Sequence, residues 1–132
     1  MGRGRGREVA MADRKAENLD WNNVPNWLAL PPEYLRLLRL NIVNLEPWHL
    51  LDASTAARRT QGLQHRYPDR KLFVFAERRD CDDVACWEEG QAGRVRIIHD
   101  FATTGWEERG NRGFDSFWDW FRAAIEEMIE FE

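Results

Sequence analysis

The sequence has few cysteines and no long hydrophobic run. Two of its 132 residues are cysteines, Cys81 and Cys86, which is too few for a disulfide scaffold and favours a reducing compartment. The longest apolar runs, such as residues 72–76, are far shorter than the roughly 20 residues that a transmembrane helix needs. The arginines near the N-terminus are not followed by the apolar stretch of a secretory signal. We therefore expect a cytoplasmic protein without a membrane partner.

The sequence also lacks the common catalytic and cofactor motifs. It has no GxSxG nucleophile elbow, no HExxH zinc motif and no phosphate-binding loop. Cys81, Cys86 and His99 do not have the spacing of a structural zinc site and lack an obvious fourth ligand. His99 and Asp100 are neighbours in a predicted strand, so they point to opposite faces and cannot form a catalytic pair. We expect a non-enzymatic protein with no cofactor or metal; a hydrolase or zinc site around these thiols is the alternative.

Charge is distributed unevenly along the chain. The net charge is -4, with 19 basic and 23 acidic residues. Residues 1–15 hold five of the basic and two of the acidic residues, which leaves 14 basic and 21 acidic residues, or -7, for the rest. An acidic body repels phosphate backbones and attracts basic proteins, so nucleic acid is an unlikely partner and a basic protein is the expected one.

The N-terminal segment and the rest of the chain differ in composition, which indicates that they are separate parts. Residues 1–17 alternate glycine with arginine and then turn polar, which predicts a flexible basic tail. Residues 18–132 are the right length for a single domain. Because short glycine-arginine segments can bind RNA, nucleic-acid binding through this tail remains an alternative function.

Two helices are predicted in the first half of the domain. Residues 31–40 begin with two prolines and carry a broad apolar face, which is typical of a helix. A second, polar helix can be capped by Asp52 or Ser54, and we predict that it ends at Gly62 and lies on the surface.

The middle of the chain is predicted to form strands. Residues 71–77, 84–89 and 94–101 are short apolar runs separated by turn-forming residues, which predicts a three-stranded antiparallel meander. Residues 41–45 could add an edge strand. Within the second strand, Cys86 is expected to be a small buried hydrophobic residue.

The clearest helix is at the end of the chain, after a cap at Asp115 or Ser116. Its carboxylates at Glu126, Glu127 and Glu130 lie near the C-terminus, where the helix dipole disfavours negative charge. The apolar face of this helix is expected to contain Phe117, Phe121, Ala124, Ile125 and Met128, widened by Trp118, Ile129 and Phe131.

The elements together predict an α+β fold with a small antiparallel sheet and a long C-terminal amphipathic helix.

We predict a partner-binding site on an acidic turn and a later loop. Carboxylates that folding does not need, and an aromatic residue in a loop, are side chains that a basic partner can use. The alternatives are that both segments are ordinary solvated turns with Trp106 in the core, or that the site lies at Glu126, Glu127 and Glu130. The predicted site residues are Asp80, Asp82, Asp83, Trp106, Glu107 and Glu108.

Three segments in order resemble the SUKH superfamily, and within it the Smi/Knr-type proteins. They are YPDRKLFVFAERRDCDDVACWEEG, RVRIIHDFATTGWEERG and FDSFWDWFRAAIEEMIEF. With VPNWLALPPEYLRLL as the amphipathic entry helix, the resemblance covers residues 24–131. The family usually has a glycine-bearing turn after this helix, whereas this sequence reads LRLNIVNLEP.

The resemblance implies a small curved sheet flanked by helices and a binding role. Bacterial members are often immunity proteins that neutralise toxins, frequently nucleases, and fungal relatives are regulatory scaffolds of cell-wall synthesis. It carries no catalytic residues over to this chain. The expected function is therefore that of an immunity protein that binds a basic toxin domain, with the regulatory scaffold as the alternative.

Overall fold

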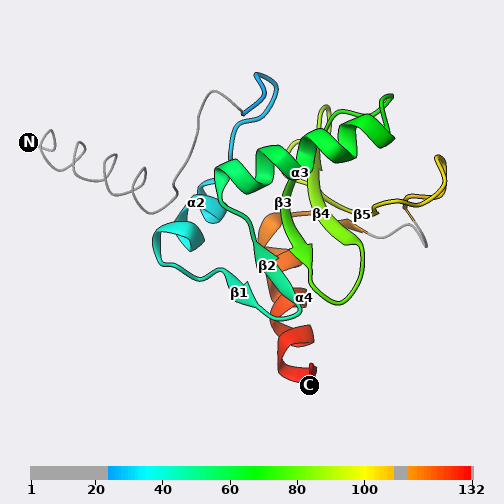
Figure 1. Ribbon diagram of the computed structural model, residues 1–132. Helices are drawn as coiled ribbons and strands as arrows, with labels where there is room; N and C mark the ends of the chain where they lie inside the picture. Colours follow the sequence, from blue (N-terminus) through cyan, green and yellow to red (C-terminus); the bar gives the residue numbers. More distant parts are fainter. Residues whose placement is uncertain (1–23, 109–112, 132) are drawn as a thin grey trace, which may run out of the picture.

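The computed structural model describes residues 24–108 and 113–131. Within them the chain forms three helices and one curled, open sheet of six antiparallel strands (Figure 1), which confirms the predicted α+β class. The predicted basic tail, residues 1–17, lies outside the described residues. None of the helices described is long and apolar enough to cross a membrane.

The six strands lie in the sheet in the same order as in the chain. The predicted meander is confirmed as its centre, and the expected edge strand is present as a two-residue strand. Two further strands were not predicted, because segments of two or three residues are too short to show a periodicity. The strands are β1 (Asn44–Leu45), β2 (Trp48–Leu50), β3 (Leu72–Arg78), β4 (Asp83–Glu88), β5 (Val95–His99) and β6 (Gly113–Phe114).

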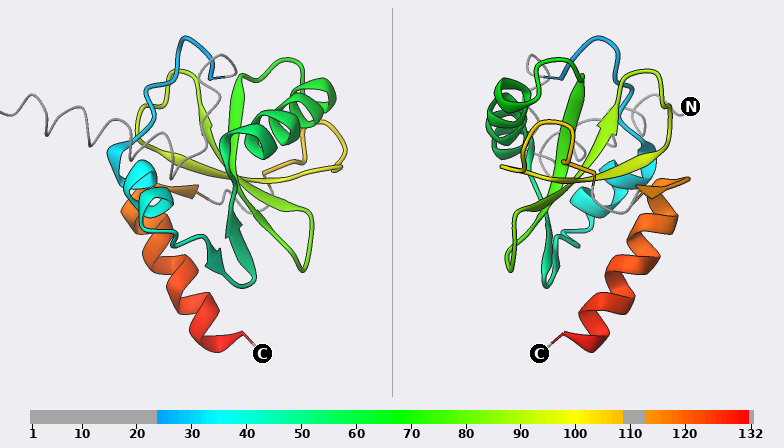
Figure 2. Two further views of the ribbon diagram at one scale, coloured as in Figure 1. Left: turned by 60° about the vertical axis from the view of Figure 1, so that its left-hand side comes forward. Right: turned by 90° about the vertical axis from the view of Figure 1, so that its right-hand side faces the viewer.

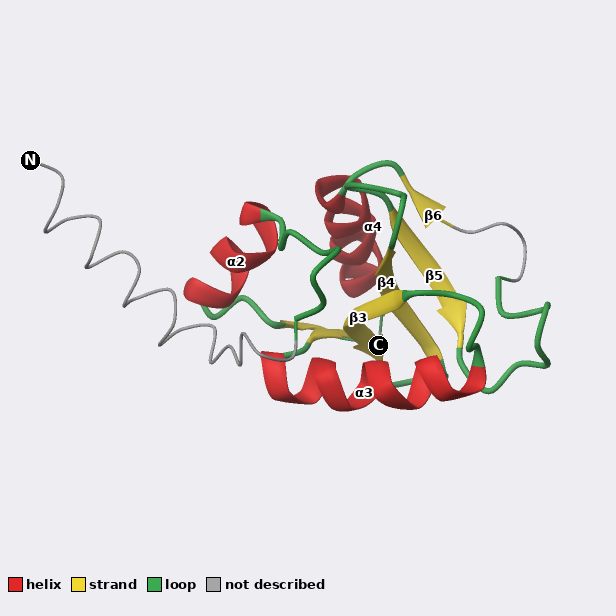
Figure 3. Cartoon of the chain, turned by 90° about the horizontal axis from the view of Figure 1, so that it is seen from above, coloured by secondary structure: helices red, strands yellow, loops and turns green. Residues whose placement is uncertain are grey.

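Helices cover both faces of the sheet. Helix α3 (Ala53–Arg66) lies along one face, and α2 (Pro32–Arg39) and α4 (Phe117–Glu130) lie on the other (Figure 3). Both faces of the central strands are therefore buried, and all five residues from Leu72 to Ala76 are inaccessible to solvent or nearly so. Because both faces are buried, the sequences of these strands are continuous apolar runs and do not alternate apolar with polar residues.

Aromatic side chains fill the space between the sheet and α4. Phe75 stacks on Trp87 with ring centroids 4.3 Å apart, and Trp120 of α4 meets the edge of Phe75 at 5.0 Å. The register of β3 against β4 shifts between Val74 and Ala76, a β-bulge that places Phe75 in this cluster. Trp120 is 1 % exposed, whereas Phe121, which we expected on the buried face, is only partly buried.

Helix α3 is longer than predicted. Asp52 caps it as expected, since its carboxylate accepts a hydrogen bond from the Thr55 N–H at 2.9 Å. The predicted end at Gly62 is wrong, and the helix continues to Arg66. Leu63, fully buried against the sheet, lies one residue beyond the glycine. Packing of this side chain outweighs the cost of about 1 kcal/mol that a glycine imposes on a helix.

The end of α2 shows how the chain turns without a glycine. Asn41 follows the helix with a φ of 58°, in the left-handed region. Its N–H donates to the Leu38 carbonyl at 3.0 Å, and the Ile42 N–H donates to the Leu37 carbonyl at 2.9 Å. This is a Schellman motif, in which asparagine takes the place usually held by glycine. Asn41 thus lets the chain reverse direction after α2 without a glycine.

Candidate partner-binding surface

The two acidic residues of the predicted loop form ion pairs with arginines from other parts of the fold. Arg70 forms ion pairs with Glu107 at 3.2 Å and Glu108 at 3.0 Å, and also with Glu88 at 2.7 Å. Arg96 makes two hydrogen bonds to the Glu108 carboxylate, at 2.7 and 2.8 Å. These bonds, with those from Arg70, hold the pKa of Glu108 below its ordinary value despite partial burial. Glu107 and Glu108 are therefore paired within the fold and are not the free carboxylates that the prediction assumed.

The same loop presents two aromatic side chains to solvent. Trp106 is 72 % exposed, which rules out the alternative that it folds back on the core. Phe101 is 61 % exposed and has a φ of 66°, a conformation that bulky side chains rarely adopt. The loop is held closed by the His99 N–H, which donates to the Glu107 carbonyl at 2.7 Å, and by the Trp106 N–H, which donates to the Thr103 carbonyl at 2.8 Å.

The three aspartates of the acidic turn between β3 and β4 differ in their burial and in their contacts. Asp83 is 4 % exposed, and its carboxylate lies 2.9 Å from Nδ1 of His99 across the β4 and β5 pair. Asp80 is exposed but accepts two hydrogen bonds from Arg78, which keep its pKa below the ordinary value. Asp82 keeps an exposed side chain. Of the six predicted site residues, Asp80, Asp82 and Trp106 remain accessible to a partner.

A buried carboxylate that we did not predict joins α3 to the sheet. Asp100 is completely buried and accepts hydrogen bonds from Arg66 at 2.6 and 2.7 Å and from Arg59 at 3.0 Å. The arginines lie 34 and 41 residues earlier in the chain, so no local pattern reveals the pairing. Asp100 therefore has a structural partner, and the histidine beside it pairs with Asp83 instead.

Negative charge gathers at one end of the molecule, which we call the acidic pole. The turn from β1 to β2, the turn from β3 to β4 and the C-terminal half of α4 all lie at this end (Figures 1 and 2). Six carboxylates face two guanidinium groups there, an excess of four negative charges. The pole comprises Glu46, Asp80, Asp82, Glu126, Glu127 and Glu130, together with Arg78 and Arg79.

Hydrogen bonds hold the segments of the acidic pole together. Arg78 donates to Asp80 and also to Glu127 of α4 at 2.9 Å. The indole N–H of Trp48 donates to the other oxygen of Glu127 at 2.7 Å. Among the described residues, Glu126 and Glu130 have no such partner, and both are exposed. These two carboxylates supply negative charge that no contact within the described fold uses.

Apolar side chains lie beside the unpaired carboxylates. Ile129 is 69 % exposed and Phe131 is 42 % exposed, so the expectation that they widen the buried face of α4 is wrong. The reason is geometric, because the last turns of α4 extend beyond the strands (Figure 1). An exposed apolar and acidic helix end is suited to contact with another protein.

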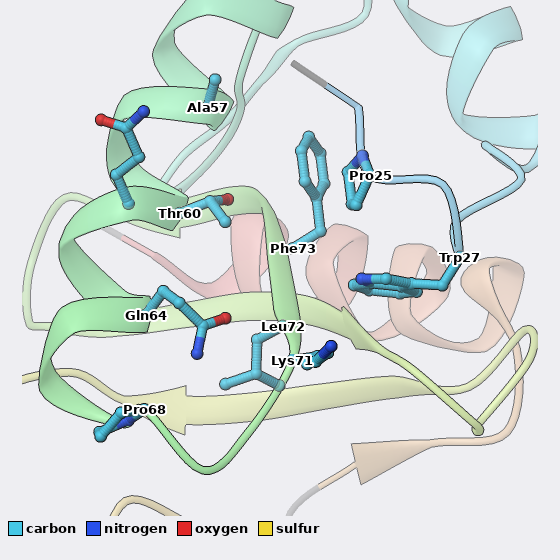
Figure 4. Close-up of a pocket in the computed structure, with 10 residues that line it drawn as sticks. Pro25, Trp27, Ala57, Thr60, Gln64, Pro68, Lys71, Leu72 and Phe73 are labelled. Atoms are coloured by element: carbon cyan, nitrogen blue, oxygen red, sulfur yellow. The ribbon is translucent and has the colours of Figure 1, made fainter. Parts of the chain in front are cut away.

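Clefts lie on both faces of the sheet. One, of about 360 Å³, lies between α3, β3 and the segment that carries Pro25 and Trp27 (Figure 4). Two polar side chains beside it already have partners, since Thr60 accepts from the Val74 N–H and the Gln64 amide donates to the Tyr67 carbonyl. The second, of about 560 Å³, opens between α4 and strands β2, β5 and β6, beside the acidic pole.

The two thiols are poorly suited to chemistry. Complete burial raises the pKa of Cys86, which confirms it as a buried hydrophobic residue, and partial burial also raises the pKa of Cys81. A thiolate nucleophile requires the opposite shift. In the described part of the chain, no three residues among His, Cys, Asp and Glu are grouped so that they could hold a metal ion.

Comparisons of the chain with protein-family models, with curated proteins and with solved structures find no match. Its function must therefore be inferred from its own residues. The surface that stands out is the acidic pole, because its charge is left over after the contacts of the described fold are formed.

Proposed function

We propose that the protein is a non-enzymatic binding domain that holds a basic partner protein at its acidic pole, and that it serves as an immunity protein against a cognate toxin. The observation that carries the proposal is the pair of exposed carboxylates on α4, Glu126 and Glu130, beside exposed Ile129 and Phe131. Acids at a helix C-terminus oppose the dipole, so this placement does not serve stability. It does serve the attraction of positive charge.

A toxin nuclease is the partner that best matches this surface. Such an enzyme binds phosphates through lysine and arginine side chains, so its working face is basic. An acidic protein that covers that face competes with the nucleic acid and associates rapidly, because complementary charge steers the encounter. The resemblance to the SUKH superfamily points to the same role. On this proposal the protein acts in the cytoplasm, where such a toxin would reach its substrate.

The test is co-expression with a toxin encoded beside the gene for this protein. We expect the wild-type protein to restore growth and to form a complex with the toxin domain on gel filtration. The double variant Glu126→Lys, Glu130→Lys should lose at least tenfold in affinity, since it turns attraction into repulsion. Glu89→Lys is the matched control, because Glu89 is also exposed but follows β4 at the opposite end of the sheet.

Two outcomes contradict the proposal. If the wild-type protein neither protects cells nor forms a complex with the neighbouring toxin, the immunity role is wrong. If the double variant at Glu126 and Glu130 binds as tightly as the Glu89→Lys control, the partner does not use the acidic pole.

A further inference from the structure

The larger cleft lies directly beside the acidic pole and shares residues with it. Trp48 and Trp120 form apolar walls, and Ile97 of β5 lies on the sheet side. On α4, the small side chains of Ala123 and Ala124 leave the space open. Its volume of about 560 Å³ falls in the range of roughly 300 to 1,000 Å³ that is typical of ligand pockets. We call it the α4 cleft.

The charged residues that line the α4 cleft, Glu126 and Glu127, are both acidic. Arg78 lies over the ring of Trp48, 5.5 Å from its centroid, and its guanidinium is already bonded to Asp80 and Glu127. An anionic ligand such as a phosphate would be repelled by this rim. A second copy of the chain would bring a second acidic pole to the contact. The chemistry that fits is an apolar group with positive charge next to it.

We propose that the α4 cleft receives one large apolar side chain, leucine or an aromatic residue, from a lysine- or arginine-bearing segment of the partner protein. The apolar side chain fills the space between α4 and β5, while the neighbouring cations contact Glu126 and Glu130. Charge then brings the partner to the pole, and the cleft selects which cationic segment stays bound. This inference rests on the proposed function and names the chemistry of the partner.

Filling the cleft from the protein side tests the inference. Ala123 lines the cleft and is only partly buried, so Ala123→Trp should occupy the space without rebuilding the core. Ala92→Trp is the matched control, because Ala92 is exposed in the turn between β4 and β5. The probe is a synthetic amphipathic peptide of lysine and leucine, and binding is measured by titration calorimetry. We expect at least tenfold weaker binding to Ala123→Trp and unchanged binding to Ala92→Trp.

Changing the probe makes the result independent of how Ala123→Trp folds. A peptide with alanine in place of every leucine should bind the wild-type protein at least tenfold more weakly. This alanine peptide should bind the wild-type protein and Ala123→Trp with equal affinity, because it has no large apolar side chain to insert into the cleft. A peptide of glutamate and leucine should not bind, because the rim repels it. Equal binding of the leucine and alanine peptides, or binding of the glutamate peptide, would overturn the inference.

The cleft and the immunity role can fail separately. If Ala123→Trp still protects cells against the toxin as well as the wild-type protein does, the cleft is not used and the inference is wrong, while the proposed function stands. If no toxin is neutralised but the lysine and leucine peptide binds in a manner that depends on the cleft, the inference stands and the immunity role falls.

Discussion

Helices α3 and α4 are equally long, lie on opposite faces of one sheet and use charge in opposite ways. Each has 14 residues. Helix α3 has basic residues and no acids, and its Arg59 and Arg66 reach back to the sheet to pair with Asp100. Helix α4 has four acids and one arginine, and its Glu126 and Glu130 pair with nothing in the described fold. The charges of Arg59 and Arg66 on α3 therefore serve folding, and those of Glu126 and Glu130 on α4 are available for binding.

The strongest way to break this comparison is to remove the buried partner of α3. Asp100→Asn removes the carboxylate that Arg66 and Arg59 share, although Arg59 keeps an ion pair with Glu77 at 3.2 Å, and breaking a buried ion pair costs several kcal/mol. Because both arginines are partly exposed, we expect a loss of about 3 kcal/mol, at the low end of the measured range. Urea denaturation measures it. A loss below about 1 kcal/mol would mean that the charge of α3 is not structural.

The local elements of the fold were predictable, and the long-range pairings were not. Asp52 and Ser116 cap helices as their sequence positions indicate, since capping depends on a few adjacent residues. The site was only partly predictable. Asp80, Asp82 and Trp106 are accessible as expected, but Asp83, Glu107 and Glu108 are bound by residues from other elements. Their partners are set by how the strands and α3 meet, which no single segment of sequence reveals.

The second prediction concerns pH and the loop that follows β5. Bonds from Arg96 and Arg70 hold the folded-state pKa of Glu108 below the ordinary glutamate value of 4.5. A lowered folded-state pKa contributes stability that is complete above pH 4.5 and is lost as the pH falls through the lower value. We expect Glu108→Gln to cost about 1 to 2 kcal/mol at pH 7. Its unfolding free energy should also fall less steeply than that of the wild type below pH 4.5.

Chemical denaturation at a series of pH values measures both effects. Glu89→Gln is the control, because Glu89 is exposed and has no ion pair among the described residues. If Glu108→Gln and the control lose stability equally between pH 7 and pH 3, Glu108 does not hold the loop to the sheet.

The third prediction separates the exposed aromatic residue of the loop from the carboxylates beside it. Trp106 is 72 % exposed, so Trp106→Ala should change the unfolding free energy by no more than about 0.5 kcal/mol. A partner that contacts the loop as well as the pole would lose affinity for this variant. Thermal melting and calorimetry with the toxin domain measure the two effects. A large loss of stability would show that Trp106 packs into the fold.

The last prediction has the most informative sign, because it expects a gain in stability from the loss of two charges. Glu126 and Glu130 lie near the C-terminus of α4, where negative charge opposes the helix dipole. Replacing both with glutamine should therefore raise the unfolding free energy by about 0.3 to 1 kcal/mol at low salt, and the gain should shrink as salt screens the charge. The same variant should bind a basic partner more weakly. Denaturation at two salt concentrations, alongside calorimetry with the lysine and leucine peptide, measures both. A double variant that is less stable than the wild type would show that these carboxylates serve the fold, and α4 would then use its charge as α3 does.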